Sequence, residues 1–311
     1  MTSHERSSAP LNRRELLARA SFAAAGAAAA SVASLPGVLR AADKPEAWKM
    51  RLSGSTVNFS RETLEEACRR IAALGFEAID IWGEFGHCRH LDYALEKLGA
   101  AGLKELLAKH GLKFYAASVY SRGYARYAKL VGEAGGAVAV RGSAGPCDKK
   151  DLVRSMKAFL ESLKPEADLA GTHNAYLAIE NHGHSLLDSL DSFKAFVDLN
   201  KHPRVGIALA PYHVQSLKQD VAEVIRAAGG QLLFFYAWQD DGKGATAVEQ
   251  LPGIGPTDCT PWLAALAEVN YRWYVNPFLH GEPPADVTQP ALAKSADYLR
   301  TCYRKAAARR K

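Results

Sequence analysis

Tyr176-Leu177-Ala178-Ile179-Glu180 and Val205-Gly206-Ile207-Ala208-Leu209 are two short apolar runs, and the segment between them includes 189–199, where apolar residues recur at helical spacing. Each run has the length and composition of a strand that is buried on both faces. A strand, a helix and a second strand in this order predict a parallel pair, because the helix carries the chain back to the starting edge of the sheet. This stretch therefore indicates an α/β protein.

The same alternation continues on both sides of this stretch, from about residue 48 onward. Apolar runs predict strands at 49–57, 76–82, 113–119, 137–141, 176–180, 205–209, 231–238 and 273–276. Helical spacing predicts helices between them, the first of which is capped by Ser60, at 60–74, 94–110, 124–133, 152–169, 189–199, 215–228, 261–269 and finally 291–304. Eight strand–helix units predict a (β/α)8 TIM barrel, a single domain over residues 48–308. An open doubly wound sheet is the alternative, which the lack of a GxGxxG pattern after the first predicted strand weakens.

The composition is that of a globular protein, with 48% hydrophobic and 23% charged residues, which excludes wholesale disorder. The longest weakly apolar run is mostly alanine, so we expect no membrane span. The five cysteines form no CxxC pair, and neither a zinc ribbon nor a disulfide framework is indicated.

The net charge of +6 is concentrated at the two ends of the chain. Residues 1–42 hold five Arg against two Glu, and residues 304–311 add five more Lys and Arg. The chain between them is slightly acidic, so a nucleic-acid partner is not expected.

Residues 1–42 have the features of an export signal. Asn12-Arg13-Arg14-Glu15-Leu16-Leu17 precedes a weakly apolar, Ala-rich stretch, 18–33. This order resembles a bacterial twin-arginine signal, although Asn12 stands where Ser or Thr is usual. We therefore expect a twin-arginine signal peptide and linker at 1–42, and export to the periplasm; an exposed Ala-rich helix is the alternative.

Chemically active side chains collect where the predicted strands end. In a barrel of this type, the carboxyl ends of the strands carry the functional site. The side chains predicted there are Trp82, Tyr120, Glu180, Asn181, His182, His213, Tyr236, Trp238, Asn276 and His280.

Several of these residues lie in segments that resemble the xylose isomerase-like family of sugar isomerases and epimerases. The segments are 177–182, 205–213 and the run Gly253-Ile254-Gly255 followed by Asp258 and Trp262. The resemblance covers about residues 50–300. It implies a TIM barrel in which Glu, Asp, His and Glu from the last four strands hold a divalent metal, and two glutamates move a proton through an enediolate.

The implied metal ligands carry over poorly to this chain. Glu180 occupies the first position, but Ala210 occupies the aspartate position, a residue at or near Trp238 the histidine position, and Asn276 the second glutamate position. A single carboxylate does not retain Mg²⁺ or Mn²⁺ against water, so the cofactor is left open and we predict no metal at the usual place. A rebuilt zinc site from Glu180, His182 and His213, with His280 or Glu282, is the alternative.

We expect Glu180 to act as general base, with His213 or His182 holding the charge that develops on the substrate oxygen. A salt bridge to Arg141 would instead make Glu180 structural. The remaining strand-end residues are predicted to bind the substrate, the aromatic ones as a platform for a sugar ring or as ordinary packing: Trp82, Tyr120, Asn181, Tyr236, Trp238, Asn276 and His280.

The predicted function is therefore that of an isomerase- or epimerase-like barrel that acts on a carbohydrate or keto-sugar by abstracting a proton next to a carbonyl. Two alternatives stay open: a non-catalytic carbohydrate-binding protein, and a metal-free keto-sugar lyase or hydratase. Both follow from the lost ligands at Ala210 and Asn276. The sequence leaves the sugar and the oligomeric state unknown.

Overall fold

The computed structural model describes residues 48–83, 85–120, 123–242 and 248–308. They belong to one compact unit, Ala47–Lys311. The predicted signal peptide and linker at 1–42 lie outside the described residues.

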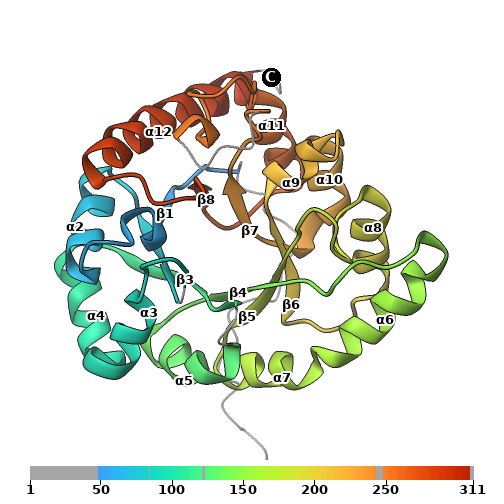
Figure 1. The fold of residues 1–311 in the computed structure, drawn as a ribbon, viewed down its shortest axis with the longest axis horizontal. Coiled ribbons are helices and arrows are strands. Elements are labelled where there is room, and N and C mark those ends of the chain that lie inside the picture. Colours follow the sequence, from blue (N-terminus) through green and yellow to red (C-terminus); the bar gives the residue numbers. More distant parts are fainter. Residues whose placement is uncertain (1–47, 84, 121–122, 243–247, 309–311) are drawn as a thin grey trace, which may run out of the picture. The chain divides into compact units, whose positions relative to one another are not determined.

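Eight parallel strands form the sheet, in the same order as in the sequence (Figure 1). Each strand pairs in parallel with the next, and a parallel bridge between Leu52 and Val275 joins the first strand to the last. The predicted TIM barrel is thereby confirmed. The strands are β1 (Ser53–Ser55), β2 (Ala78–Trp82), β3 (Lys113–Ser118), β4 (Val138–Gly142), β5 (Tyr176–Glu180), β6 (Val205–Leu209), β7 (Leu232–Ala237) and β8 (Val275–Pro277).

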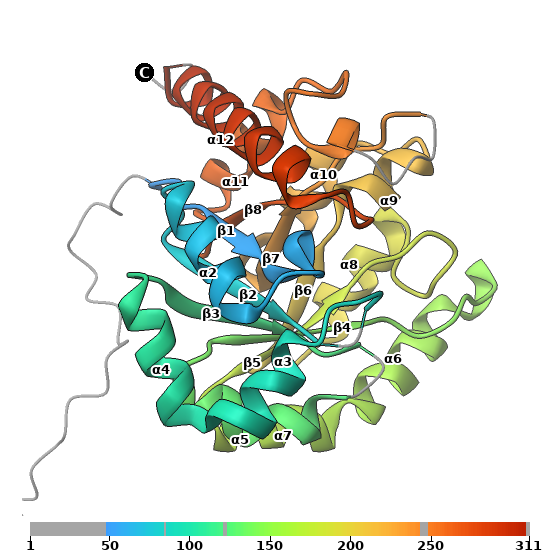
Figure 2. The ribbon, with the colours of Figure 1, turned by 60° about the vertical axis from the view of Figure 1, so that its left-hand side comes forward.

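Helices surround the strands on the outside, as Figures 1 and 2 show. They are α2 (Leu64–Ala73), α3 (His90–Tyr93), α4 (Gly99–Lys109), α5 (Tyr124–Ala134), α6 (Leu152–Ser162), α7 (Lys164–Thr172), α8 (Leu190–Leu199), α9 (Pro211–Ser216), α10 (Val221–Ala228), α11 (Thr260–Glu268) and α12 (Ala285–Ala308). None of these helices, within the described ranges, is long and apolar enough to cross a membrane.

The core has two layers because successive strand residues point to opposite faces of the sheet. One set packs outward against the helices, as Ile79 and Ile81 do from β2. The other set fills the inside of the barrel, as Trp82 and Tyr236 do. Polar residues that share the inward positions are therefore held inside the barrel.

Several predicted boundaries are wrong near helix ends. The cap of α2 is Thr63, whose hydroxyl accepts from the backbone N–H of Glu66 at 3.2 Å, and Ser60 instead follows a short 3-10 turn, Thr56–Phe59. The first strand is correspondingly shorter than predicted. Both residues carry a hydroxyl, so the sequence pattern alone did not distinguish them.

The predicted helix at 152–169 is two helices, α6 and α7, which meet at Leu163. Pro165 lies in the first turn of α7, where a missing N–H costs nothing, and this proline requires a new helix rather than the continuation of the old one. The segment predicted at 94–110 also divides. A π-helical turn, Ala94–Leu98, ends at Gly99, which is also the first residue of α4. The φ of +62° at Gly99 interrupts the helix between the two segments.

Three further helices differ in extent from their predictions. The segment predicted at 215–228 is α9 and α10, and Asp220 caps α10 by accepting from the N–H of Ala222 at 2.7 Å. The helix α11 begins at Thr260, one residue before the predicted 261. The last helix begins six residues before the predicted 291 and contains Pro290 near its start.

Candidate active site

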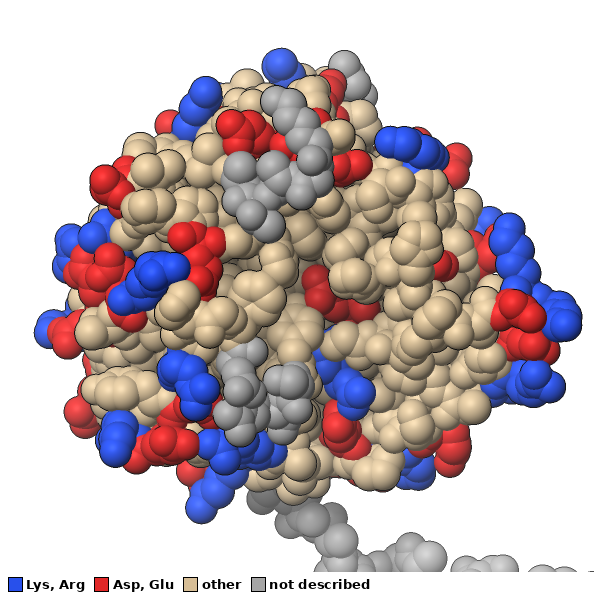
Figure 3. Space-filling view, viewed as in Figure 1, with Lys and Arg blue, Asp and Glu red and all other residues tan. Residues whose placement is uncertain are grey.

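The candidate site lies inside the barrel, at the carboxyl ends of the strands. Asp80 and Trp82 point inward from β2, and Tyr236 points inward from β7. Glu180 is the last residue of β5. The space-filling view shows a hollow near the middle of the molecule, with acidic atoms at depth and mostly uncharged residues around it (Figure 3).

Asp80 is a fully buried carboxylate with three hydrogen-bond donors. Its Oδ2 accepts from the Ser55 hydroxyl at 2.7 Å and from the Trp82 indole N–H at 2.5 Å, and its Oδ1 accepts from the Ser118 hydroxyl at 2.9 Å. Burial raises the pKa of Asp80 to about 6, although all three donors favour the ionised form. The surroundings are therefore built for a negative charge at this point.

Glu180 is half-buried and accepts a hydrogen bond from the Tyr120 hydroxyl at 2.7 Å. Burial raises its pKa to about 7; the Tyr120 hydrogen bond opposes this rise and the negative charge of Asp80 adds to it. Arg141, the structural partner that sequence considerations left open, instead binds Glu166 at 2.8 Å. Glu180 is thus free of a cationic partner in the described part of the chain.

A continuous chain of hydroxyl groups connects the two carboxylates. The Tyr236 hydroxyl lies 3.2 Å from Ser118 Oγ and 3.3 Å from the Tyr120 hydroxyl oxygen. Ser118 gives its one proton to Asp80, and Tyr120 gives its proton to Glu180. The Tyr236 proton therefore points to one or the other of these two oxygens, and the chain runs without a break from β2 to β5.

Three predicted histidines gather beside this chain. The rings of His182 and His213 are 4.0 Å apart between centroids, and Trp238 stacks on His280 at 5.5 Å. Burial, helped by the neighbouring His182 and His280, lowers the pKa of His213 to about 3. The pKa of His280 is lowered for the same reasons. His213 is consequently a neutral ring at physiological pH, able to donate one hydrogen bond.

Trp238 contributes an unusual donor to the same region. Its ring stacks on Tyr212 with centroids 4.4 Å apart and meets Phe278 edge-on at 5.3 Å. Its indole N–H is buried and has no hydrogen-bond partner among the described residues. A buried donor without a partner is costly, and such groups are found where a ligand completes the bonding.

The predicted aromatic residues do come together. Trp82 stacks on Phe278 at 5.5 Å and lies 5.1 Å from Tyr120 between ring centroids. Trp82, Phe278 and Trp238 are each less than 5% exposed, so they line a packed interior and leave only limited faces for a sugar.

Two predicted substrate-binding amides are fully engaged with the protein itself. The Asn181 side chain donates to the carbonyl oxygen of Ala210 at 3.2 Å and accepts from the Ala210 N–H at 2.7 Å. The Asn276 amide donates to Ser53 Oγ at 3.2 Å, and its Oδ1 lies 3.3 Å from Ser55 Oγ, whose one proton is shared with the shorter bond to Asp80. The structure thus shows both amides in positions that join neighbouring strands.

The residues at the family's ligand positions do not fit a divalent metal. Ala210 offers no ligand atom, the Trp238 indole can only donate, and both polar atoms of the Asn276 amide are engaged. The rebuilt zinc site with Glu282 is not formed either, since Glu282 lies 2.6 Å from the ring of His87 instead. No group of three or more His, Cys, Asp or Glu in the described ranges is placed to hold a metal ion.

Sequence considerations missed Asp80, Ser118 and Ser55. Asp80 could have been noticed, because it interrupts the apolar strand Ala78-Ile79-Asp80-Ile81-Trp82 at an inward position shared with Trp82. The serines carry no such signal, because their role depends on which strand ends the barrel brings together.

Comparison with known proteins agrees with this architecture. The chain is similar to D-psicose 3-epimerase (17% identity, 82% of this chain and 99% of that chain, TM-score 0.64) and to 3-keto-D-glucoside 4-epimerase from E. coli (18%, 80% and 100%, TM-score 0.62). It is also similar to a probable 3-DHS dehydratase from Bacillus anthracis (14%, 78% and 97%, TM-score 0.63). These identities show the shared fold alone, and no curated protein matches the sequence. The model of one family, the xylose isomerase-like TIM barrel, matches residues 68–302, and since this is most of the chain, the protein belongs to that family.

Proposed function

We propose that this protein is a carbohydrate-active enzyme that removes a proton from the carbon next to the carbonyl of a keto-sugar, with Glu180 as the general base. One observation carries the proposal: Glu180 lies half-buried at the end of β5, held by Tyr120, with a pKa raised to about 7. A base whose pKa is near the working pH combines a large ionised fraction with good basicity. The sugar epimerases of the same fold support the choice of substrate class.

The step begins when the Glu180 carboxylate takes the proton from carbon. The electron pair of the broken C–H bond forms a C=C bond, and the carbonyl π electrons move to oxygen, which becomes an enolate oxygen. The neutral His213 ring and the partnerless indole N–H of Trp238 supply donors for that charge. Delivery of a solvent proton to the opposite face of the enolate gives epimerisation, and loss of a β-hydroxyl together with a proton, as water, gives elimination.

The hydroxyl chain provides a second location for the abstracted proton. Once Glu180 is protonated, the Tyr120 hydroxyl turns so that it accepts from Glu180 and donates to Tyr236. A concerted shift then moves one proton from Glu180 to Tyr120, one from Tyr120 to Tyr236, one from Tyr236 to Ser118, and one from Ser118 to Asp80. The charges balance, because Glu180 becomes ionised as Asp80 becomes neutral. No step is assigned to a metal, because the residues at the family's ligand positions do not fit one.

The test uses a panel of keto-sugars in D₂O, with NMR detection of deuterium at the carbon next to the carbonyl. Glu180→Gln should lower the exchange rate by about 10²- to 10⁴-fold, the usual contribution of a positioned base. Glu105→Gln, the same change on the exposed side of α4, should leave it unchanged. The wild-type rate should rise with pH and level off above about 7, where Glu180 is ionised.

An undiminished rate in Glu180→Gln would remove Glu180 from the mechanism. Sugar binding without any exchange or elimination in the wild type would favour the binding protein that the changes at Ala210 and Asn276 also allow. Product analysis separates the two enzymatic alternatives, because elimination releases water and epimerisation does not.

We also propose that the protein is exported by the twin-arginine route, on the basis of Arg13-Arg14 and the Ala-rich stretch that follows. Cell fractionation of the full chain tests this. Replacing both arginines by lysine should retain the protein in the cytoplasm, and unchanged export of that variant would argue against the signal.

A further inference from the structure

A cavity of about 1210 Å³ opens at the other end of the barrel, away from Glu180. Its walls include Tyr176 and Leu232, the first residues of β5 and β7, and Trp273 from the segment before β8. Tyr176 and Glu180 are the two ends of the same strand, roughly 13 Å apart at 3.3 Å per residue. The cavity is therefore separate from the candidate active site.

Aromatic rings form a large part of this cavity's surface. Tyr115 stacks on Trp273 with centroids 5.9 Å apart, and Trp273 meets Tyr176 edge-on at 5.6 Å. The hydroxyls of Tyr115 and Tyr271 are tied to backbone carbonyls of Leu233 and Tyr274, at 2.5 and 3.0 Å. These bonds fix the rings, so the cavity offers a rigid apolar surface. Trp273 remains half-exposed and can accept a stacking partner, whereas the Arg204 guanidinium already lies 4.9 Å over the half-exposed ring of Tyr176.

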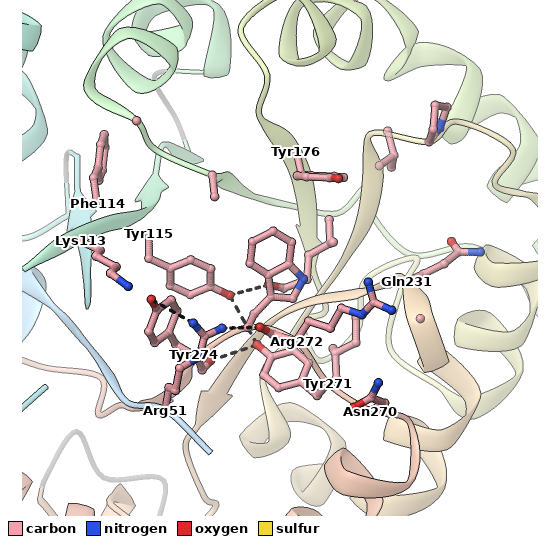
Figure 4. A pocket seen from close by; sticks show the side chains of 18 of the residues that line it. Arg51, Lys113, Phe114, Tyr115, Tyr176, Gln231, Asn270, Tyr271, Arg272 and Tyr274 are labelled. Carbon is pink, nitrogen blue, oxygen red and sulfur yellow. Dashed lines mark hydrogen bonds between the residues drawn. The ribbon is translucent and has the colours of Figure 1, made fainter. Parts of the chain in front are cut away.

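The charged residues that line the cavity are all basic. They comprise five Lys and Arg, together with His202, and no Asp or Glu: Arg51, Lys104, Lys113, Lys201 and Arg272. Figure 4 shows Arg51, Lys113 and Arg272 around the labelled tyrosines. The bulk of the chain between residue 42 and residue 304 is slightly acidic, so this concentration is local.

The cations differ in how firmly they are held. The Arg51 guanidinium donates to the carbonyl oxygen of Arg272 at 2.5 Å and lies 4.4 Å over the ring of Tyr274. Lys113 and Arg272 are exposed, and their side chains have no carboxylate partner in the part of the chain that the structure describes. The negative charge of Glu77 helps to raise the pKa of the nearby Tyr274 hydroxyl, but Glu77 does not line the cavity. Two cations are thus available to an incoming anion.

We propose that this cavity binds an aromatic carboxylate, with its ring against Trp273 and its carboxylate held by Arg272, while Lys113, on the other side of the tyrosines in Figure 4, adds to the positive potential. A guanidinium pairs with a carboxylate through two parallel hydrogen bonds, and a flat ring stacks on indole and phenol faces. The volume exceeds that of a small aromatic acid and admits substituents on its ring.

The experiment measures binding of 2-naphthoate to the purified protein by tryptophan fluorescence and calorimetry. The neutral 2-naphthamide, with the same ring, serves as the matched ligand. Loss of a charge-assisted contact of about 1.5–3 kcal/mol predicts that the amide binds at least roughly tenfold more weakly. The double variant Lys113→Gln, Arg272→Gln should weaken naphthoate binding by at least about the same factor. Both residues are exposed, so the variant should fold.

Two controls locate the binding. Lys157→Gln with Lys194→Gln removes the same charge from exposed positions on α6 and α8, and should leave the affinity unchanged. Trp273→Phe should abolish the fluorescence change, and Glu180→Gln should preserve it, so this result does not depend on the proposed reaction. Equal affinity for naphthoate and naphthamide would overturn the proposal. Equal losses of naphthoate affinity in the cavity variant and the control variant would also overturn it. The same holds if a short oligonucleotide binds more tightly than naphthoate and naphthoate does not displace it.

Discussion

Tyr236 lies at the middle of the hydroxyl chain between Asp80 and Glu180, so it separates the role of the chain from that of the two acids. Tyr236→Phe removes the link from Ser118 to Tyr120 but leaves each carboxylate its own donor. If the chain moves protons, kcat should fall roughly tenfold or more while KM stays unchanged, because the lost group acts in a proton transfer and not in substrate binding. The pH dependence of kcat should shift as well, since the two acids no longer titrate as a linked pair.

The control for this change is Tyr303→Phe. It removes the hydrogen bond that the partly buried Tyr303 hydroxyl donates to the Trp48 carbonyl oxygen, on the outside of the barrel. It should leave kcat and its pH profile as in the wild type. A Tyr236→Phe enzyme with wild-type kcat and pH profile would show that the hydroxyls only hold the carboxylates in place.

The lack of metal-ligand atoms at the family's ligand positions predicts how the reaction responds to removal of metal ions by a chelator. Ala210 and Asn276 provide no free ligand atom, so incubation with EDTA should leave the deuterium exchange rate within about twofold, and elemental analysis should find well below one equivalent of Mn, Zn or Mg. A stoichiometric metal whose removal abolishes exchange would show that other residues form a site, and would bring metal-assisted isomerisation forward.

The single residues of the site differ in how far the sequence could predict them. Glu180 was predictable because an acid that ends a buried strand rarely lacks a function. Tyr120 and Tyr236 were predictable as strand-end aromatics, but their hydroxyl bonds were not. The link from Ser118 to Tyr236 joins residues 118 positions apart, and it depends on barrel register and side-chain rotamer, neither of which a sequence pattern encodes.

At the scale of elements, the seam between β1 and β8 depends on a few side chains. A single backbone bridge, Leu52 to Val275, is accompanied by the bonds of Asn276 to Ser53 and Ser55. Asn276→Ala removes the amide that donates to Ser53, while Ser55 keeps its bond to Asp80, and should lower the free energy of unfolding by about 1–3 kcal/mol. In a double-mutant cycle with Ser53→Ala, urea unfolding should give a coupling energy of at least about 0.5 kcal/mol. Strict additivity would mean that the amide does not stabilise the seam.

The periodicity of apolar residues was sufficient to predict the strands, but it was not sufficient to predict the helix boundaries. Alternating apolar runs predicted all eight strands, because the outer helices cover one face of each strand and the side chains inside the barrel cover the other. Helix boundaries failed where two local signals compete. Pro165 and Gly99 interrupt stretches whose apolar spacing continues across them, and the spacing alone favoured one long helix.

At the scale of the whole molecule, buried acids and buried histidines oppose each other in the pH dependence of stability. Asp80 and Glu180 have pKa values raised from 3.8 and 4.5 to about 6 and about 7, so the stability they contribute is full at low pH and is lost as the pH rises through that window. The pKa of His213 is lowered from 6.5 to about 3, so its contribution is present above pH 6.5 and is lost as the pH falls.

Two acids oppose one histidine, so the stability of the wild type should fall by on the order of 1–2 kcal/mol between about pH 4.5 and 6.5, and a variant that removes one of these groups should change the slope. In Glu180→Gln only Asp80 and His213 remain and nearly cancel, so the curve should be almost flat, and above about pH 7 the variant should have gained on the order of 2–3 kcal/mol relative to the wild type, a few degrees in Tm. His213→Gln should tilt the curve the other way, with its gain at acidic pH. Scanning calorimetry from pH 4 to 8 measures all three proteins, with Glu105→Gln as the surface control. Parallel curves for the wild type and Glu180→Gln would show that Glu180 keeps an ordinary pKa, and the base proposed for the reaction would then lack its tuning.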